Sequence, residues 1–364
     1  MSAAWGNNIK LSIFGESHGK GIGVNIDGLP VGIELDLDYI KKDMDRRAPG
    51  NSDLTTPRKE EDKFEILSGY FNGKTTGAPL CIVIYNKNTI SEDYEKTREL
   101  IRPSHSDYTG FVKYSGFNDY RGGGHFSGRI TAPLVFAGAI CRQILEKKEI
   151  YIGSHIKNIK NIEDESFDMV NVKAESLKKL RGSSFPLLNN NFENIMKEVI
   201  INAKNDKDSV GGIIETAVIN LSPGLGEPFF DSVESTLAHL IFSVPGVKGI
   251  EFGAGFGISK MKGSEASDEY YIQNGKIQTY TNNNGGILGG ITTGMPLIFR
   301  VGVKPTASIG KIQNTVDIIR QENATVEIKG RHDPCIVTRA LPVVEAVTAI
   351  GIYDLLLACK GKGY

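Results

Sequence analysis

The chain has 364 residues, and its 42 Lys and Arg side chains nearly balance 43 Asp and Glu side chains, giving a formal net charge of -1. This length suits one or two domains with a large core, and the balanced charge provides no global basic field for nucleic acid or an anionic membrane. The amino terminus lacks the basic and apolar regions of a signal peptide, and no apolar run reaches the ~18 residues of a membrane span, so we expect a cytoplasmic protein.

In the first half of the chain, local patterns predict a hairpin and two helices. Residues 23–35 alternate and contain turn residues, which predicts a β-hairpin. Asp36 is placed to cap a helix over residues 37–47, with Ile40 and Met44 on one face. A further helix is predicted to begin at Thr131, because its apolar residues recur at helical spacing. These residues are Leu134, Ala137, Cys141, Ile144 and Leu145.

In the second half, residues 189–205 predict a helix and residues 211–221 predict a half-buried strand. The apolar stripe of that helix comprises Phe192, Ile195, Met196, Val199, Ile200 and Ala203. The last helix is predicted to start at Pro342, since proline is tolerated in a first turn, and to run to Leu357. The stretch 157–191 is poor in glycine and rich in Lys, Asn and Asp, so we interpret it as a peripheral excursion.

Four stretches combine glycine with titratable side chains, and the first is GESHGKGIG from Gly15 to Gly23. Its GxGxG spacing favours a dinucleotide-binding turn only if a helix follows, and a hairpin pattern follows instead. The residues alone leave open whether His18 is an ordinary turn histidine or a catalytic group. The second stretch, RPSHSDYTG, places Arg102 near His105 and Asp107. This pattern fits a metal half-site, an imidazole oriented by a carboxylate, or a hydrogen-bonded loop.

The third stretch, DYRGGGHFSGR, leads directly into the helix predicted from Thr131. Glycines allow a ligand to approach the backbone, Ser127 offers a hydroxyl group, and Arg121 and Arg129 offer charge beside a helix start. A phosphate site is the functional interpretation, and a glycine-rich turn with solvated arginines is the structural alternative.

The fourth stretch, KGRHDPCIVTRA, concentrates charge just before an apolar helix. It contains Arg331, His332, Asp333 and Arg339, and Arg46, Arg47 and Arg58 also lie beside glycine and proline. So many arginines with so few acids indicate a site for a substrate with several negative groups, because the guanidinium fork matches phosphate and carboxylate. His155 and His239 lack such neighbours and are interpreted as structural. The cysteines Cys81, Cys141, Cys335 and Cys359 lack paired spacing, so we expect buried free thiols rather than a zinc knuckle or disulfides.

These segments closely resemble those of the chorismate synthase family over nearly the whole chain. The matching motifs are GESHG, DGLP, DMDRRAPG, EILSGYFNGKTTGAP, RPSHSDYTG, DYRGGGHFSGR, GLGEP, NNNGGILGGITTG, KPTASI and GRHDPCIVTRALPVVEA. The resemblance implies an α+β fold, in which residues 1–364 form a single-domain sandwich with helices packed between antiparallel sheets. It also implies a homotetramer.

The same resemblance implies an activity. Family members convert 5-enolpyruvylshikimate 3-phosphate into chorismate and phosphate by anti-1,4-elimination, with reduced FMN and no net redox change. NADPH would serve only indirectly, as a reductant, and an external flavin reductase is a candidate partner; neither nucleic acid nor a membrane is expected as one. The residues alone also leave two other classes of protein open. A metal-dependent phosphohydrolase would use His105, Asp107, His332 and Asp333 as ligands, and a non-catalytic flavin or nucleotide sensor would not need its histidines.

By resemblance, three residues receive catalytic roles. His18 corresponds to a general acid near the departing phosphate, His105 to a histidine that protonates the flavin, and Asp333 to a carboxylate that works with the flavin's central-ring nitrogen. The implied substrate ligands are Ser17, Arg47, Ser127, Arg129 and Arg331. The implied cofactor ligands are His125, Phe126, Ser127, Gly289, Lys304, Pro305, Thr306, Ala307, Ser308 and Arg331. No metal is expected.

Four positions depart from the family pattern. Asn25 stands where an aliphatic residue is common, which affects packing and not chemistry. Ala48 and Asp53 stand where many relatives have arginine, so we expect no nicotinamide cofactor to bind to that loop. His125 also replaces an arginine and is assigned only a binding role.

Overall fold

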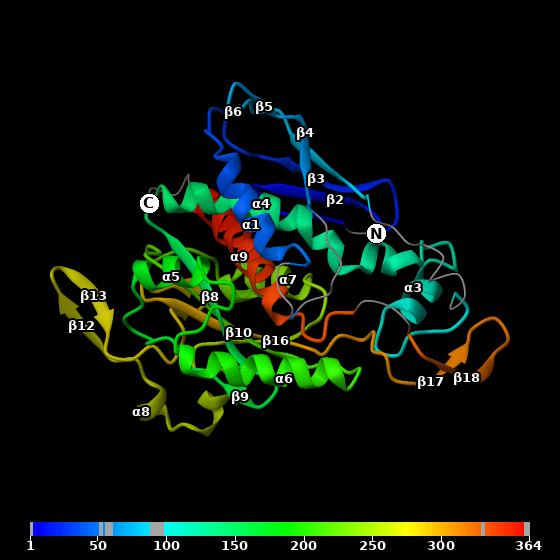
Figure 1. The fold of residues 1–364 in the computed structure, drawn as a ribbon. Helices are drawn as coiled ribbons and strands as arrows, with labels where there is room; N and C mark the ends of the chain where they lie inside the picture. The colour runs from blue at the N-terminus through cyan, green and yellow to red at the C-terminus, as the bar shows by residue number, and fades with distance from the viewer. Residues whose placement is uncertain (1–2, 51–53, 55–60, 88–97, 329–331, 360–364) are drawn as a thin grey trace.

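Two antiparallel sheets enclose a layer of helices (Figure 1). The structure is a computed structural model that describes residues 3–50, 54, 61–87, 98–328 and 332–359. Every strand pairing within these residues is antiparallel. The predicted α+β class, with helices between antiparallel sheets, is confirmed.

The first sheet has the order β1-β2-β3-β7-β4, and the second has the order β11-β16-β10-β8-β9. The strands of the first are β1 (Ala4–Trp5), β2 (Lys10–Gly15), β3 (Gly21–Asp27), β4 (Phe64–Ser68) and β7 (Leu80–Tyr85). Those of the second are β8 (Tyr151–Ile159), β9 (Ile162–Glu163), β10 (Gly212–Ile219), β11 (Val247–Phe252) and β16 (Leu297–Val303). Short two-stranded pairs are formed by β5 (Tyr70–Phe71) with β6 (Lys74–Thr75), β12 (Tyr270–Gln273) with β13 (Lys276–Thr279), β14 (Ile287–Leu288) with β15 (Ile291–Thr292), and β17 (Gln313–Asp317) with β18 (Glu322–Val326).

The helices of the described residues are α1 (Leu37–Arg47), α3 (Asp107–Lys113), α4 (Thr131–Glu146), α5 (Ala174–Arg181), α6 (Glu193–Asn205), α7 (Val233–Phe242), α8 (Gly263–Ala266) and α9 (Val337–Cys359). The predicted helices at 37–47 and from Thr131 are present, and Asp36 caps α1 by accepting a hydrogen bond from the Tyr39 amide. Short 3-10 segments include η1 (Arg121–Phe126) and η2 (Gly128–Ile130), which precede α4.

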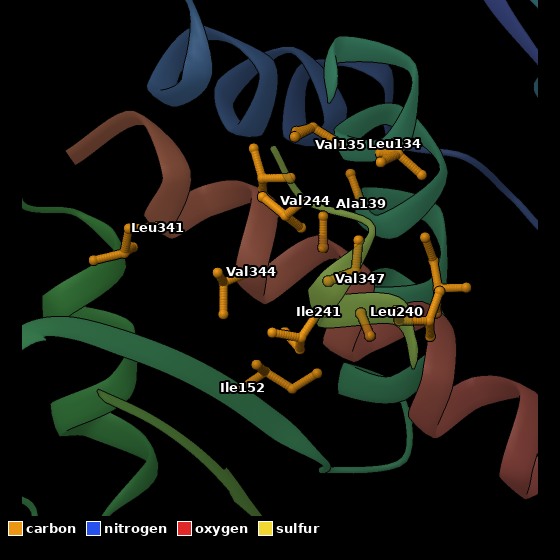
Figure 2. Packing of buried hydrophobic residues seen from close by; sticks show 14 of the residues in the cluster. Leu134, Val135, Ala139, Ile152, Leu240, Ile241, Val244, Leu341, Val344 and Val347 are labelled. Atoms are coloured by element: carbon orange, nitrogen blue, oxygen red, sulfur yellow. The ribbon is translucent and has the colours of Figure 1, made fainter. Parts of the chain in front are cut away.

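Part of the main hydrophobic core lies where α4, α7 and α9 meet the second sheet (Figure 2), and the same core continues to β2, β3 and β7 of the first sheet. The part drawn in Figure 2 includes Val135 and Ala139 of α4, Ile241 of α7, and Val344 and Val347 of α9. Each fully buried aliphatic side chain contributes about 1.5–3 kcal/mol by leaving water. The α4 and α9 backbones approach closely, because a Cβ atom on Gly138 would lie 2.4 Å from Ala346 Cα.

Helix α9 differs from its prediction in two respects. It begins at Val337, so Pro342 lies inside the helix, where proline cannot donate a backbone hydrogen bond. Of the helices in the described residues, α9 alone is long and apolar enough to cross a membrane by length and composition, although no such run was expected. However, 89% of its most apolar window is buried, as in the core helix of a globular fold.

Three further expectations need correction. Residues 23–35 do not form a hairpin, because Gly21–Asp27 is one strand, β3, paired with β2 and β7. Strand β10 is buried on both faces rather than half-buried: Val218 belongs to the main core, whereas Ala217 packs in a second cluster with Leu177 of α5. On α6, Ile195 is exposed, although Met196 and Ile200 are buried as expected.

The stretch 157–191 begins within β8 and includes β9 and α5. A Cβ atom on Gly153 of β8 would lie 2.8 Å from Leu177 Cβ, so α5 packs tightly on this strand. The stretch therefore covers one face of the second sheet.

Candidate active site

A cavity of about 740 Å³ collects most of the residues singled out from the sequence. Among the described residues that line it, the permanent cations are Arg47, Arg102, Arg129, Lys304 and Arg339, and the carboxylate is Asp333. Small-molecule sites commonly occupy ~300–1,000 Å³. The arginine-rich, acid-poor site inferred from the sequence is thus assembled in one place.

The predicted site residues that line this cavity come from five segments. They are Arg47, His105, His125, Phe126, Ser127, Arg129, Lys304, Pro305, Thr306, Ala307, Ser308 and Asp333. Arg331 lies outside the described residues, as do Asp53 and Arg58. Gly289 does not line the cavity. The next residue, Gly290, lies against Ser232 at the start of α7, and it is the opposite end of α7 that lines the cavity. The roles of all these residues stay predictions.

Ser17 and His18 lie in the turn between β2 and β3, where both side chains are buried. The Asn86 side-chain amide donates to the carbonyl oxygens of Glu16, at 3.0 Å, and Gly19, at 2.9 Å. The Ser17 amide donates to Gly124 O at 3.1 Å. The GESHG turn is therefore held in place by the segment that follows β7 and by the glycine run.

The glycine run lies between the two predicted catalytic histidines. A Cβ atom on Gly122 would lie 2.6 Å from His18 Nε2, and one on Gly123 would lie 3.3 Å from His105 Nε2. All three glycines from Gly122 to Gly124 have positive φ angles, which favour glycine. The sequence indicated ligand approach as the reason for these glycines. The structure adds that no side chain fits between the histidine rings.

His105 belongs to a network with Asp107 and Arg102. Its Nδ1 atom lies 2.6 Å from Asp107 Oδ1, and since a carboxylate only accepts, Nδ1 carries the proton. Arg102 donates from Nε and Nη2 to the same carboxylate, at 2.7 Å each. Burial raises the pKa of Asp107, but the hydrogen bonds from Arg102 and His105 outweigh it and hold the pKa far below its usual range. Of the three alternatives for this stretch, the carboxylate-oriented imidazole is the one formed.

Arg47 and Arg129 approach the cavity from α1 and η2, and both are almost completely buried. Each donates to the buried carboxylate of Asp62. Burial raises the pKa of Asp62, but the charges of Arg47 and Arg129 outweigh it and lower that pKa. Asp62 and Asn86 were not identified from the sequence.

Two other arginines named from the sequence have structural partners. Arg46 donates to Glu345 at 2.7 Å, and Arg142 donates to the same carboxylate at 3.0 Å. Arg121 pairs with Asp119. Neither Arg46 nor Arg121 lines the cavity.

The fourth stretch enters the cavity just before α9. Asp333 forms an ion pair with Arg339 on the first turn of α9. His332 is largely buried, and burial together with the charge of Arg102 lowers the pKa of His332. This favours a neutral imidazole at neutral pH.

Several buried polar atoms at this site have no protein partner. Among the described residues they include Ser17 Oγ, Arg47 Nε, Thr306 Oγ1 and His332 Nε2. Buried polar groups normally have hydrogen-bond partners, and those without one require an explanation. Three of these atoms belong to residues that line the cavity, namely Arg47, Thr306 and His332. The fourth, Ser17 Oγ, lies next to Gly122, which also lines the cavity. A ligand with several polar groups fits these atoms.

The two histidines interpreted as structural have different surroundings. His155 is buried between Asp164 and Glu215 in the second sheet, as a structural histidine would be. His239 is exposed near the end of α7 and lines the cavity, a position that its sequence interpretation did not anticipate. The sequence around His239 gives no signal of this position, because α7 is brought to the cavity by packing against segments that are distant in the chain. No group of three or more metal-ligating side chains occurs among the described residues.

Together, fold and cavity define an α+β protein with a small-molecule site for an anionic ligand. A family model described as chorismate synthase matches residues 9–357. The chain is 48% identical to a chorismate synthase from Dehalococcoides mccartyi, over 98% of this chain and 97% of that protein, and 44% identical to one from Thermococcus kodakarensis, over 97% of each. A crystal structure of a chorismate synthase superposes with a TM-score of 0.77 at 28% identity, covering 98% of this chain and 94% of the other.

The chain therefore belongs to the chorismate synthase family. It is a carbon–oxygen lyase of the shikimate pathway.

Proposed function

We propose that this chain converts 5-enolpyruvylshikimate 3-phosphate into chorismate and phosphate by anti-1,4-elimination, in the presence of reduced FMN. The observation that carries the proposal is the cavity, in which five permanent cations surround a single carboxylate among the described lining residues. The substrate carries a phosphate and two carboxylates, and FMN carries another phosphate. In the elimination, the carbon–oxygen bond to phosphate breaks, a proton leaves carbon 6, and a carbon–carbon double bond forms. Atoms and electrons balance without an oxidant.

The residues present fit reduced FMN beside the substrate. The unpartnered Thr306 hydroxyl and the Lys304 ammonium group suit the flavin's phosphate or its polar ring edge. Lys304 Nζ donates to Ser104 O at 2.6 Å, which places it next to the loop that carries His105. When bound, reduced FMN supplies electron density without being consumed.

The protein's own groups would position and transfer protons. The Cδ2–Nε2 edge of His18 faces Gly122 at the cavity wall, where it would donate a proton to the departing phosphate. Asp107 holds His105 by Nδ1, leaving Nε2 on the side of Gly123 for an exchange with the cofactor. Asp333 would assist removal of the proton from carbon 6. Arg47, Arg129 and Ser127 would hold the substrate's anionic groups, as would Arg331.

Anaerobic turnover with chemically reduced FMN tests this function, with and without NADPH. We expect chorismate and phosphate in equal amounts, with much less FMN than product and no effect of NADPH while FMN stays reduced. Release of phosphate without chorismate would instead indicate hydrolysis. In the structure, the two carboxylates named for a metal hydrolase are held in ion pairs: Asp107 with Arg102, and Asp333 with Arg339.

We also propose a single-domain subunit, assembled as a cytoplasmic homotetramer that receives reduced flavin from an external reductase. The main hydrophobic cluster includes residues from Ile9 to Leu355 and both sheets, which supports one domain. Large exposed aromatic side chains, including Phe229, Phe230 and Phe256, support contact with other subunits. Sedimentation equilibrium would measure the assembly state.

A further inference from the structure

Asp62 is a buried carboxylate between two arginines of the cavity wall. Its side chain is 0% exposed, and those of Arg47 and Arg129 are 2% and 5% exposed. Arg47 donates from Nη2 to Asp62 Oδ2, and Arg129 donates from Nη1 to Asp62 Oδ1 at 2.7 Å. One carboxylate thus fixes both guanidinium groups and neutralises only one of their two charges.

Asn86 fixes the other side of Arg129. Its side-chain oxygen accepts a hydrogen bond from Arg129 Nε at 2.6 Å, while its side-chain amide donates to Glu16 O and Gly19 O of the GESHG turn. Arg129 is therefore bound at both ends of its guanidinium group. The same amide that orients Arg129 also holds the turn that carries His18.

The network continues to the other side of the cavity. Arg339 donates from Nε to the carbonyl oxygen of Arg47 at 3.2 Å and forms its ion pair with Asp333. Hydrogen bonds therefore link the His18 turn to Asp333 through Asn86, Arg129, Asp62, Arg47 and Arg339. Long arginine side chains that would otherwise move independently share one buried anchor.

We propose that Asp62 and Asn86 are positioning residues, which hold Arg47 and Arg129 in the geometry that binds the anionic groups of the substrate. This inference rests on the proposed function. Neither residue reaches the cavity wall, so both act through the arginines. The alternative is that Asp62 competes with the substrate for the arginines, and the two possibilities predict opposite changes in affinity.

Asp62→Asn tests the proposal, because it keeps the shape of the side chain and removes its charge. The measurements are KM and kcat for 5-enolpyruvylshikimate 3-phosphate with excess reduced FMN, and the Kd for inorganic phosphate by calorimetry. Displacing a side chain that binds a ligand commonly weakens affinity or activity by about 10- to 100-fold. We therefore expect KM and the phosphate Kd to rise by that factor. An unchanged or lower value of both constants in a folded variant would overturn the proposal.

Asp43→Asn is the matched control. Asp43 is also a buried carboxylate that contacts arginines, namely Arg46, Arg142 and Arg181, but none of these lines the cavity. This variant should lower Tm while leaving KM and the phosphate Kd as in the wild type. If Asp43→Asn raised KM and the phosphate Kd as much as Asp62→Asn does, general destabilisation would explain both results, and the proposal would be contradicted.

Asn86→Ser gives a second test that changes no charge and applies even if Asp62→Asn does not fold. We expect a higher KM because Arg129 loses a partner. We also expect a lower kcat because the His18 turn loses the two hydrogen bonds that the Asn86 amide donates. Wild-type values of both would overturn the role of Asn86. Absence of turnover in the wild type would contradict the proposed function and not the positioning role. The Kd values for inorganic phosphate of the wild type and the variants would then test the positioning role.

Discussion

Gly122 lies so close to His18 that a Cβ atom at position 122 would come within 2.4 Å of His18 Cδ2. We therefore expect Gly122→Ala to displace the imidazole and reduce kcat by about 100-fold, the cost of a displacement of ~1 Å. Gly73→Ala is the control, because Gly73 also has a positive φ angle, an added Cβ would meet no atom within 4 Å, and the residue does not line the cavity. Equal kinetics of the two variants, measured on purified folded protein, would show that this contact does not set the position of His18.

His18→Ala removes the proposed general acid. The variant should fold and bind FMN normally, because the turn is held by backbone groups and by Asn86. A positioned general acid contributes about 100- to 10,000-fold, so we expect kcat to fall within this range. Fluorescence titration of FMN and steady-state turnover check both parts. Wild-type turnover would remove His18 from the mechanism.

Asp107→Asn should turn His105 away from its proton-exchange geometry. An amide can present either its oxygen or its NH₂ group to Nδ1, so the variant no longer fixes the protonated nitrogen. We expect a lower kcat with little change in KM for the substrate, together with a shifted pH profile of kcat. A profile that superposes on that of the wild type would mean that Asp107 supports only the fold.

Asp333→Asn should slow proton removal while leaving FMN bound. The measurement is anaerobic single turnover with substrate deuterated at carbon 6, followed by rapid quench. If Asp333 assists this step, the isotope effect on product formation should increase in the variant, because proton removal becomes slower relative to the other steps. An unchanged rate and isotope effect would assign Asp333 to another role.

Glu345→Gln should destabilise the protein in a pH-dependent way. Burial raises the pKa of Glu345, but Arg46 and Arg142 outweigh it and lower the pKa to about 2 from 4.5. Because the folded pKa is depressed, this stabilisation is present above about pH 4.5 and is lost as the pH falls toward 2. At pH 7 we expect a loss of about 3–5 kcal/mol in the free energy of unfolding, since the buried guanidinium group of Arg142 and the partly buried one of Arg46 both lose a partner.

The difference between wild type and Glu345→Gln should therefore shrink between pH 6 and pH 3 in urea unfolding experiments. Asp208→Asn is the control, because Asp208 pairs with Lys311 at the surface, with side chains 40% and 49% exposed. Such pairs contribute about 0–1 kcal/mol. A difference for Glu345→Gln that does not depend on pH would contradict the assigned cause.

Helices α1, α4, α6 and most of α9 could be predicted from sequence because their signals are local, whereas α3, α5, α7 and α8 were not predicted. Asp36 and the spacing of Ile40 and Met44 define α1 within one segment. The hairpin prediction at 23–35 was wrong because strand partners are chosen by the fold: β3 pairs with β7, about fifty residues further along the chain.

The motifs that carry the proposed site residues were visible in the sequence, whereas the residues that anchor them were not. Asp62 and Arg129 are 67 residues apart, and Asn86 and Arg129 are 43 apart. Asp62 lies in a run of charged residues that resembles solvated surface, and Asn86 simply follows a strand. Only the fold brings them to the arginines, so spacing within a motif carries no information about them.

The close crossing of α4 and α9 also has a consequence for the chemistry. Helix α4 follows directly on the segment that carries Ser127 and Arg129, and α9 follows directly on Asp333. At Gly138 and Ala346 the two backbones touch without an intervening side chain. The two walls of the candidate site are therefore joined by a helix crossing in the core. We expect the width of the cavity to depend on this crossing as well as on the loops that line it.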